Sequence, residues 1–260
     1  MSGDISSGLA SAIRQLARSE RLLVALDFDG TLAPLVDRPE DARALPEARD
    51  AVERLAALPE TRVAFISGRA MASLLEVAAP PASALLSGSH GVETRLDAEP
   101  GVELTEQERA GVLRLREILE GVAAEHPGTW VEVKPAGFAL HSRGVAADVA
   151  ASANASAHER VVAELPDTTE RHGSNVLEFS VRSTTKGDAV RMLREFSRAT
   201  AVLFAGDDVT DEDGFRALGD GDLSLKCGGG DTSAEFRVED PSGVARVLAL
   251  LAEERATQYS

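Results

Sequence analysis

The sequence has little cysteine and no long hydrophobic run, and each shortage excludes a class of protein. A single cysteine, Cys227, excludes an internal disulfide and fits the reducing cytoplasm. No uninterrupted apolar run reaches the roughly 18 residues that a membrane-spanning helix needs. The first residues, MSGDISSGLASAIRQLARSE, lack a basic start and a long apolar core, so they are not expected to be a secretion signal. We therefore expect a cytoplasmic protein.

Positive charge is also scarce. The chain has 27 Lys and Arg against 43 Asp and Glu, a formal net charge of −16. Nucleic acids and anionic membranes attract basic surfaces, so neither is expected as a partner. A small-molecule substrate and a monomeric protein are expected instead. If that substrate is an anion, local positive charge must overcome the repulsive background.

Short apolar runs alternate with helical patterns at both ends of the chain. This alternation predicts an α/β fold, a parallel sheet with helices on both faces. The expected strands are LLVALDF (22–28), RVAFIS (62–67), ALLSG (84–88), AVLFAG (201–206) and DLSLKCG (222–228). The expected helices are 46–58, 70–78, Lys186 to about Arg198, a short one after 206, and 242–254.

The middle of the chain follows a different pattern. A helix (105–126), two strands within WVEVKPAGFALHSR (130–143), a helix (about 145–165) and the strand NVLEFSV (175–181) are expected in succession. Because these elements do not alternate, they indicate an α+β unit inserted into the first domain. The expected division is 1–103 and 184–260 for the core domain and 104–183 for the insertion.

Two acidic segments each follow an apolar strand. LDFDGT places Asp27 and Asp29 after the first strand, and GDDVTDED (206–213) follows the strand at 201–206. The carboxyl ends of parallel strands share one edge of a sheet, where ligands bind. Carboxylates that close repel each other unless a cation lies between them, and oxygen ligands without a His or Cys cluster favour Mg²⁺. Taken alone, the first segment is also compatible with a turn and the second with a solvated loop.

Four segments in a fixed order resemble the haloacid dehalogenase-like hydrolases: DFDGTL (27–32), SGR (67–69), TKGDAV (185–190) and GDDVTDED (206–213). The resemblance implies that Asp27 is a nucleophile that forms an aspartyl-phosphate and that Asp29 is the general acid and base. It implies that Ser67 and Lys186 bind the phosphoryl oxygens.

The same resemblance implies a Mg²⁺ site. Its ligands would be the Asp27 carboxylate, the backbone carbonyl of Asp29 and the Asp207 carboxylate. Asp208 and Asp211 would support these ligands without binding the ion directly. The bound Mg²⁺ and Lys186 would supply the local positive charge that an anionic substrate needs.

A closer resemblance extends from about Leu22 to Leu250. SHGVE (89–93), VEVKPAGFALHSR (131–143), VLEFSVRSTTKGDAV (176–190) and GDDVTDEDGF (206–215) are similar to the trehalose-6-phosphate phosphatase family. This implies a Rossmann-like parallel-sheet core with an inserted α+β cap domain that sets specificity, and Mg²⁺-dependent hydrolysis of trehalose 6-phosphate. The substrate-binding residues that it implies are Gly68, Arg69, His90, Glu132, Lys134, His141, Arg143 and Glu178.

Five of these residues also have a structural interpretation. Glu132 and Lys134 alternate on a strand and fit a solvated face, and His141 fits a structural polar residue. His90 fits a residue that fixes the turn at 88–91, and Arg143 fits a partner of a surface acid. The sequence departs from the family at Phe28, where Tyr is common, and at Ser142, where an aromatic residue is common.

Three other functions remain compatible with the sequence. One is a phosphatase of the same superfamily that acts on sucrose phosphate or mannosyl-phosphoglycerate. Another is a phosphomutase, which would return the phosphoryl group to a sugar. The third is a sugar-phosphate sensor without catalysis, although a sensor has no need of Asp27, Asp29, Lys186 and Asp207 together.

Overall fold

The computed structural model describes residues 5–97, 104–173 and 175–259. Contacts within the chain divide it into two compact units. Unit 1 comprises Met1–Gly101 and Thr184–Ser260, and unit 2 comprises Val102–Ser183. The boundary expected after residue 103 falls at the end of the stretch 98–103, which lies outside the described residues.

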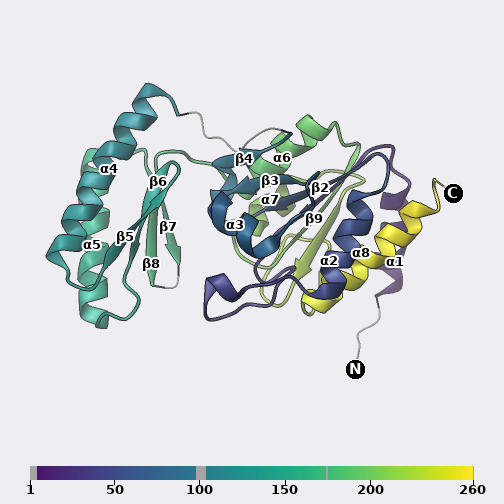
Figure 1. Ribbon diagram of the computed structural model, residues 1–260, viewed down its shortest axis with the longest axis horizontal. Coiled ribbons are helices and arrows are strands. Elements are labelled where there is room, and N and C mark those ends of the chain that lie inside the picture. The colour runs from purple at the N-terminus through teal and green to yellow at the C-terminus, as the bar shows by residue number, and fades with distance from the viewer. Residues whose placement is uncertain (1–4, 98–103, 174, 260) are drawn as a thin grey trace. The chain divides into compact units, whose positions relative to one another are not determined.

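Unit 1 is built on a seven-stranded sheet in the order β11–β10–β9–β1–β2–β3–β4. Figure 1 labels β2, β3, β4 and β9 of this sheet. All neighbouring strands pair in parallel except β3 and β4. The predicted α/β class with a parallel sheet is therefore confirmed. The strands are β1 (Leu22–Leu26), β2 (Thr61–Ile66), β3 (Leu85–Gly88), β4 (Glu93–Arg95), β9 (Ala201–Gly206), β10 (Leu223–Cys227) and β11 (Phe236–Val238).

Helices cover both faces of this sheet because its central strands are apolar on both sides. In β1, Leu22, Val24 and Leu26 belong to one core cluster, and Leu23 and Ala25 belong to another. The first cluster includes α1 (Ser7–Ala17), α2 (Pro46–Ala56), α3 (Met71–Ala78) and α8 (Pro241–Ala256); the second includes α6 (Lys186–Ser197) and α7 (Asp211–Arg216). Among the described residues, no helix has the length and apolar character needed to cross a membrane.

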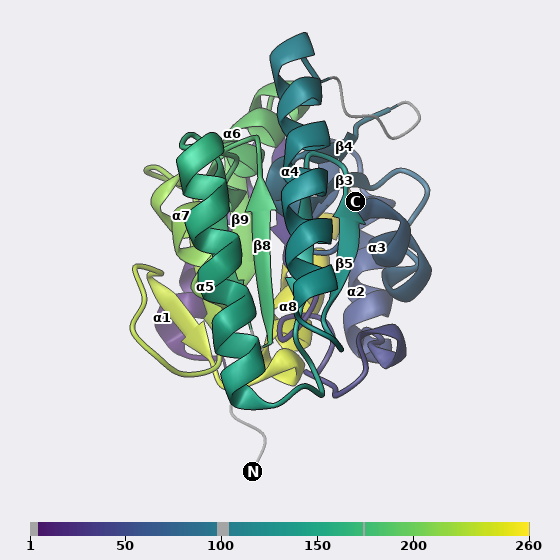
Figure 2. The ribbon, with the colours of Figure 1, turned by 90° about the vertical axis from the view of Figure 1, so that its left-hand side faces the viewer.

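Unit 2 is a four-stranded antiparallel sheet, in the order β5–β6–β8–β7, with two helices on one face. Figure 2 shows α4 and α5 side by side in front of the strands of this sheet. Phe138, Leu140, Leu177 and Phe179 pack against these helices, and their strand neighbours point to the opposite face. The elements are α4 (Glu106–Glu125), β5 (Trp130–Lys134), β6 (Gly137–His141), α5 (Ala147–Glu164), β7 (Thr169–Gly173) and β8 (Val176–Ser180).

The sequence predicts only one strand after the second helix of unit 2, and this prediction is wrong. Strand β7 precedes β8 and pairs with it along its whole length. Its sequence, TERHG, contains no apolar residue, so it gives no alternating pattern. It is a strand because β8 offers it a hydrogen-bonding edge. The short strands β4 and β11, of three residues each, also escape prediction.

Candidate active site

Polar residues gather at the carboxyl edge of the unit 1 sheet. Asp27 directly follows β1, Ser67 follows β2, and Asp207 follows β9. The 3₁₀ turn η2 (Ser89–Gly91) follows β3. Since β1 lies between β9 and β2, the segments predicted to meet at one edge of the sheet do meet there.

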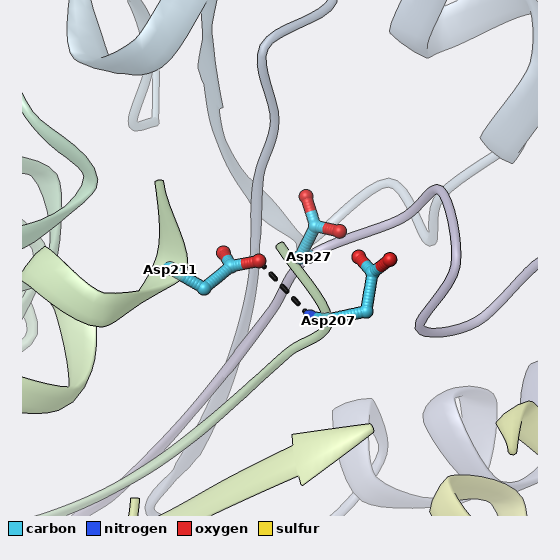
Figure 3. A group of neighbouring side chains, drawn as sticks. All are labelled: Asp27, Asp207 and Asp211. Carbon is cyan, nitrogen blue, oxygen red and sulfur yellow. Dashed lines mark hydrogen bonds between the residues drawn. The ribbon is translucent and has the colours of Figure 1, made fainter. Parts of the chain in front are cut away.

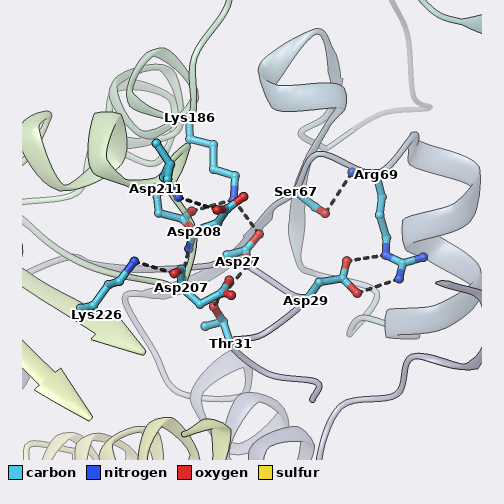
Figure 4. A network of polar contacts seen from close by, with 11 residues as sticks. Asp27, Asp29, Thr31, Ser67, Arg69, Lys186, Asp207, Asp208, Asp211 and Lys226 are labelled. Carbon is cyan, nitrogen blue, oxygen red and sulfur yellow. Dashed lines mark hydrogen bonds and ion pairs between the residues drawn. The ribbon is translucent and has the colours of Figure 1, made fainter. Parts of the chain in front are cut away.

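Asp27 is held by a buried lysine (Figure 4). The Lys186 ammonium donates to Asp27 Oδ1 at 2.8 Å and to Asp211 Oδ1 at 2.6 Å. Asp27 is 4% exposed, Lys186 3% and Asp211 0%. Thr185 caps α6 by accepting a hydrogen bond from the Asp188 N–H. This cap fixes the first turn of the helix, so the lysine leaves the turn directly toward Asp27.

The carboxylates of this cluster oppose one another's ionisation. Burial raises the pKa of Asp27 well above its ordinary value, and the charge of Asp211 raises it further, against the attraction of Lys186. Burial and the charge of Asp211 raise the pKa of Asp207 to about 6. Burial alone would lower the pKa of Lys186, but Asp27 and Asp211 outweigh it and raise that pKa above its ordinary value. A bound cation would relieve this repulsion between acids.

Three carboxylates could share a metal ion. Asp27, Asp207 and Asp211 each offer an oxygen, and these atoms lie within 4.8 Å of one another (Figure 3). Asp211 is already engaged, since its Oδ2 accepts the backbone N–H groups of Asp207 at 3.0 Å and Asp208 at 2.9 Å. Asp27 and Asp207 are therefore the better direct ligands. Carboxylate oxygens of this kind suit a hard divalent cation.

Glycine at position 30 lets the first acidic segment approach the second. Gly30 has φ +78°, and a Cβ there would lie 2.0 Å from Asp207 Oδ2. The Thr31 hydroxyl lies 3.3 Å from Asp27 Oδ2 and 3.4 Å from Asp207 Oδ1. The Asp29 carbonyl, expected as a further metal ligand, belongs to this same turn, and its role stays a prediction.

The Asp29 side chain points to an arginine in the second motif (Figure 4). Arg69 donates to both of its oxygens, from Nε at 2.5 Å and from Nη2 at 2.7 Å. Ser67 Oγ accepts the backbone N–H of Arg69 at 3.1 Å. A Cβ on Gly68 would lie 2.7 Å from the His90 ring, so the imidazole packs directly on this glycine.

Asp208, expected to support the metal ligands, contacts Asp211 through its backbone, and its expected role stays a prediction. Its N–H donates to Asp211, whereas its exposed carboxylate accepts the N–H of Val209 at 2.7 Å. The carboxylate of Asp208 therefore shapes its own loop.

One charged residue beside the acidic segment, Lys226, was not expected from the sequence. The Lys226 ammonium is buried in β10, donates to the backbone carbonyl of Asp207 and lies 4.0 Å from Glu212 Oε1. Glu212 Oε2 accepts the N–H and the hydroxyl of Ser233 at 2.8 and 2.7 Å. A lone lysine inside an apolar strand was the available signal, because such a residue is rarely buried without a partner.

A second polar cluster lies on the open face of the unit 2 sheet. Glu132 accepts from Lys134 at 2.7 Å and faces His141 Nε2 at 2.8 Å. Strand pairing places Glu132, Ala139, Glu178 and Arg171 in one row across the sheet. Arg171 Nη1 lies 4.0 Å from Glu178 Oε1, and this arginine escapes sequence analysis because its strand does.

The two glutamates of the cluster have different electrostatic surroundings. The hydrogen bond from His141, followed by that from Lys134, lowers the pKa of Glu132 to about 2 despite partial burial. Burial raises the pKa of Glu178 above its ordinary value. Arg143, also expected at the site, is exposed in the turn after β6, and its neighbour Ser142 is buried and donates its N–H to the Asn175 carbonyl.

Residues 25–242 match the trehalose-phosphatase family model. The chain is 32% identical over 245 residues to the bifunctional trehalose-6-phosphate synthase/phosphatase of Thermoproteus tenax, matching 90% of this chain and 32% of that protein. It is 32% identical over 216 residues to the trehalose-6-phosphate phosphatase of Escherichia coli, matching 82% of this chain and 79% of that protein. The chain thus spans about a third of the first relative and most of the second.

Two solved structures share the fold at lower identity. The trehalose-6-phosphate phosphatase of Aspergillus fumigatus superposes with a TM-score of 0.72 at 24% identity, covering 96% of this chain and 99% of that one. The C-terminal domain of the Candida albicans trehalose-6-phosphate phosphatase gives 0.77 at 21% identity, covering 95% and 97%. At these identities the likeness concerns the fold alone.

Proposed function

Because the chain belongs to the trehalose-phosphatase family, we propose that it hydrolyses trehalose 6-phosphate to trehalose and phosphate, with Mg²⁺ as cofactor and Asp27 as the nucleophile. The observation that carries this proposal is the buried contact of Lys186 with Asp27, 2.8 Å long, beside Asp207. The buried carboxylate of Asp27 provides a nucleophile, and the lysine that contacts it provides a cation for the phosphoryl group.

In the first half of the proposed reaction, an Asp27 oxygen attacks phosphorus. The bond from phosphorus to the sugar oxygen breaks, and Asp29 gives its proton to that oxygen. Lys186 and the Ser67 hydroxyl hold phosphoryl oxygens, stabilising the charge that moves during transfer. Mg²⁺, held by Asp27 and Asp207, would neutralise phosphoryl charge.

In the second half, water attacks the aspartyl-phosphate at phosphorus and Asp29 takes its proton. The bond between phosphorus and the Asp27 oxygen breaks, which releases phosphate and restores the carboxylate. Asp29 must leave its two hydrogen bonds with Arg69 for both proton transfers. Each transfer needs the Asp29 carboxyl group within hydrogen-bonding reach of the reacting oxygen. Its exposed side, 32% of the side chain, leaves room for such a movement.

Sugar recognition is assigned to the open face of the unit 2 sheet. A disaccharide offers hydroxyl groups that donate and accept, and this face holds both kinds of partner. Glu132 and Glu178 would accept, and Lys134 and His141 would donate. The low pKa of Glu132, about 2, keeps it an acceptor throughout the physiological range.

The test is phosphate release from a panel of substrates, with Mg²⁺ and with EDTA. The expected result is rapid release from trehalose 6-phosphate, slow release from sucrose 6-phosphate, mannosyl-phosphoglycerate and glucose 6-phosphate, and none in EDTA. Faster release from another member of the panel would change the assigned substrate but leave the proposed mechanism of phosphate release in place. Transfer of phosphate to a second sugar would indicate a mutase, and binding without release would indicate a sensor.

A further inference from the structure

Trp130, the only tryptophan of the chain, is half exposed at the start of an edge strand. It is 52% exposed, an unusual position for a large apolar side chain. Its indole stacks on the imidazole of His141, the residue that pairs with it across β5 and β6. The ring centroids are 4.0 Å apart and the planes differ by 3°.

The stack is connected to the polar cluster of unit 2. Trp130 and Glu132 are two residues apart on β5, so both side chains stand on the open face of the sheet. With one face against the indole, the His141 ring directs Nε2 to Glu132 Oε2 at 2.8 Å. Lys134 holds the other oxygen of Glu132 at 2.7 Å. Each oxygen of the Glu132 carboxylate thus has a partner, and one of these partners, His141, stacks on Trp130.

We propose that Trp130 is a positioning residue for sugar binding. Its indole orients His141, which in turn orients the Glu132 carboxylate that accepts sugar hydroxyls. The inference rests on the proposed function for the identity of the sugar. The stack itself explains why the chain keeps a large aromatic side chain half in water.

Kinetics separate a positioning role from a structural one. Trp130→Leu should raise KM for trehalose 6-phosphate roughly two- to tenfold, the range for one aromatic pair, with kcat on p-nitrophenyl phosphate changed less than about twofold. Trp130→Phe, which keeps a ring against His141, should restore most of the loss. Val133→Ala is the matched control, because Val133 lies on the same strand, is 63% exposed and points to the opposite face. Equal losses on both substrates, or no rescue by Phe, would mean that Trp130 only stabilises the unit.

Fluorescence tests the stack directly and without turnover. Because Trp130 is the sole tryptophan, its emission reports this position alone. Trehalose with Mg²⁺ and phosphate should change the emission of the wild-type protein saturably. Glu132→Gln should shift the half-saturation point at least about threefold higher, within the range for one ordinary hydrogen bond. Sucrose serves as the comparison sugar. If no sugar of the panel changes the emission, the inference fails even when phosphate release from trehalose 6-phosphate is normal. If another disaccharide gives the response, the positioning role stands and the proposed substrate falls.

Discussion

Arg69 holds both carboxylate oxygens of Asp29, through Nε at 2.5 Å and Nη2 at 2.7 Å. The arginine is anchored in turn by Ser73 Oγ, which accepts from Nη1 at 3.2 Å. The Arg69 side chain is only 11% exposed, whereas the Asp29 side chain is 32% exposed. The residue proposed as general acid and base is therefore oriented by a fixed partner, and the reaction requires that this partner release it.

This contact predicts a leaving-group effect for Arg69→Gln. The variant loses two charge-assisted hydrogen bonds and leaves Asp29 unoriented, so kcat/KM for trehalose 6-phosphate should fall at least about tenfold, the low end for such a bond. The loss should be smaller for p-nitrophenyl phosphate, whose leaving group needs no proton. Arg62→Gln, which removes an ion pair with Asp97 elsewhere on the surface of unit 1, is the control. Equal losses on both substrates would assign Arg69 to phosphate binding instead.

Asp27→Asn should abolish turnover. The amide keeps the shape of the carboxylate but is a poor nucleophile and a poor metal ligand. We expect a loss of at least about a thousandfold, roughly 4 kcal/mol of barrier. Beryllium fluoride, a mimic of the phosphoryl group, should raise the Tm of the wild-type protein with Mg²⁺ and not that of the variant. Near-normal activity of the variant would refute the nucleophile assignment.

Mg²⁺ should stabilise the protein more at about pH 7.5 than at about pH 5. The folded pKa values of Asp27 and Asp207 are raised, the latter to about 6. Without metal, their contribution to stability is greatest below the unfolded pKa and is lost as pH rises through the folded values. Mg²⁺ needs both groups ionised, so its binding strengthens over the same range.

The size of that effect follows from mass action. Mg²⁺ at about 100 times its Kd contributes about 2.7 kcal/mol, and a tenfold weaker Kd at about pH 5 would halve this. Thermal unfolding with and without Mg²⁺ at both pH values measures it, with Asp207→Asn as the control that should lose the Mg²⁺ response. An equal Mg²⁺ shift at both pH values would exclude Asp207 as a ligand.

Substitutions in the polar cluster of unit 2 should affect one substrate class only. Glu132→Ala and Glu178→Ala should each reduce kcat/KM for trehalose 6-phosphate at least about tenfold, because each removes a partner of a sugar hydroxyl. A small phosphate ester should lose less than about threefold. Glu125→Ala, whose side chain is 53% exposed on α4, should change neither rate. No loss with either substrate would contradict the disaccharide assignment.

The strands β1 and β9, which the sequence predicts, differ in apolar composition from the strand β7, which it misses. β1 and β9 are apolar runs buried on both faces, so composition alone reveals them. β7 has no apolar residue and becomes a strand only through its pairing with β8. Its row partner Arg171 therefore could not be assigned to the open face of unit 2 before the pairing was known.

Contacts within the site follow the same division. Asp27, Lys186 and Asp207 each stand in a recognisable motif, and the sheet order brings the motifs together. The two hydrogen bonds from Arg69 to Asp29 depend on side-chain directions at the ends of two adjacent strands. The two residues are 40 positions apart in the chain. No spacing rule fixes such directions, so the contact becomes visible only in three dimensions.

Lys226 gives a last prediction, for a residue that no motif marks. Its buried ammonium links the backbone carbonyl of Asp207 to Glu212, and so fixes the loop that carries a proposed metal ligand. Lys226→Met keeps the length of the side chain but leaves a buried acceptor unsatisfied, which costs about 1–3 kcal/mol. Part of that cost should appear as a weaker metal site: the Mg²⁺ concentration for half-maximal activity should rise several-fold, together with a lower Tm. Arg216→Met is the matched control, because Arg216 lines one pocket together with Lys226 and Asp207 but its side chain is 62% exposed. A lower Tm with an unchanged Mg²⁺ requirement would show that Lys226 stabilises the fold without acting on Asp207.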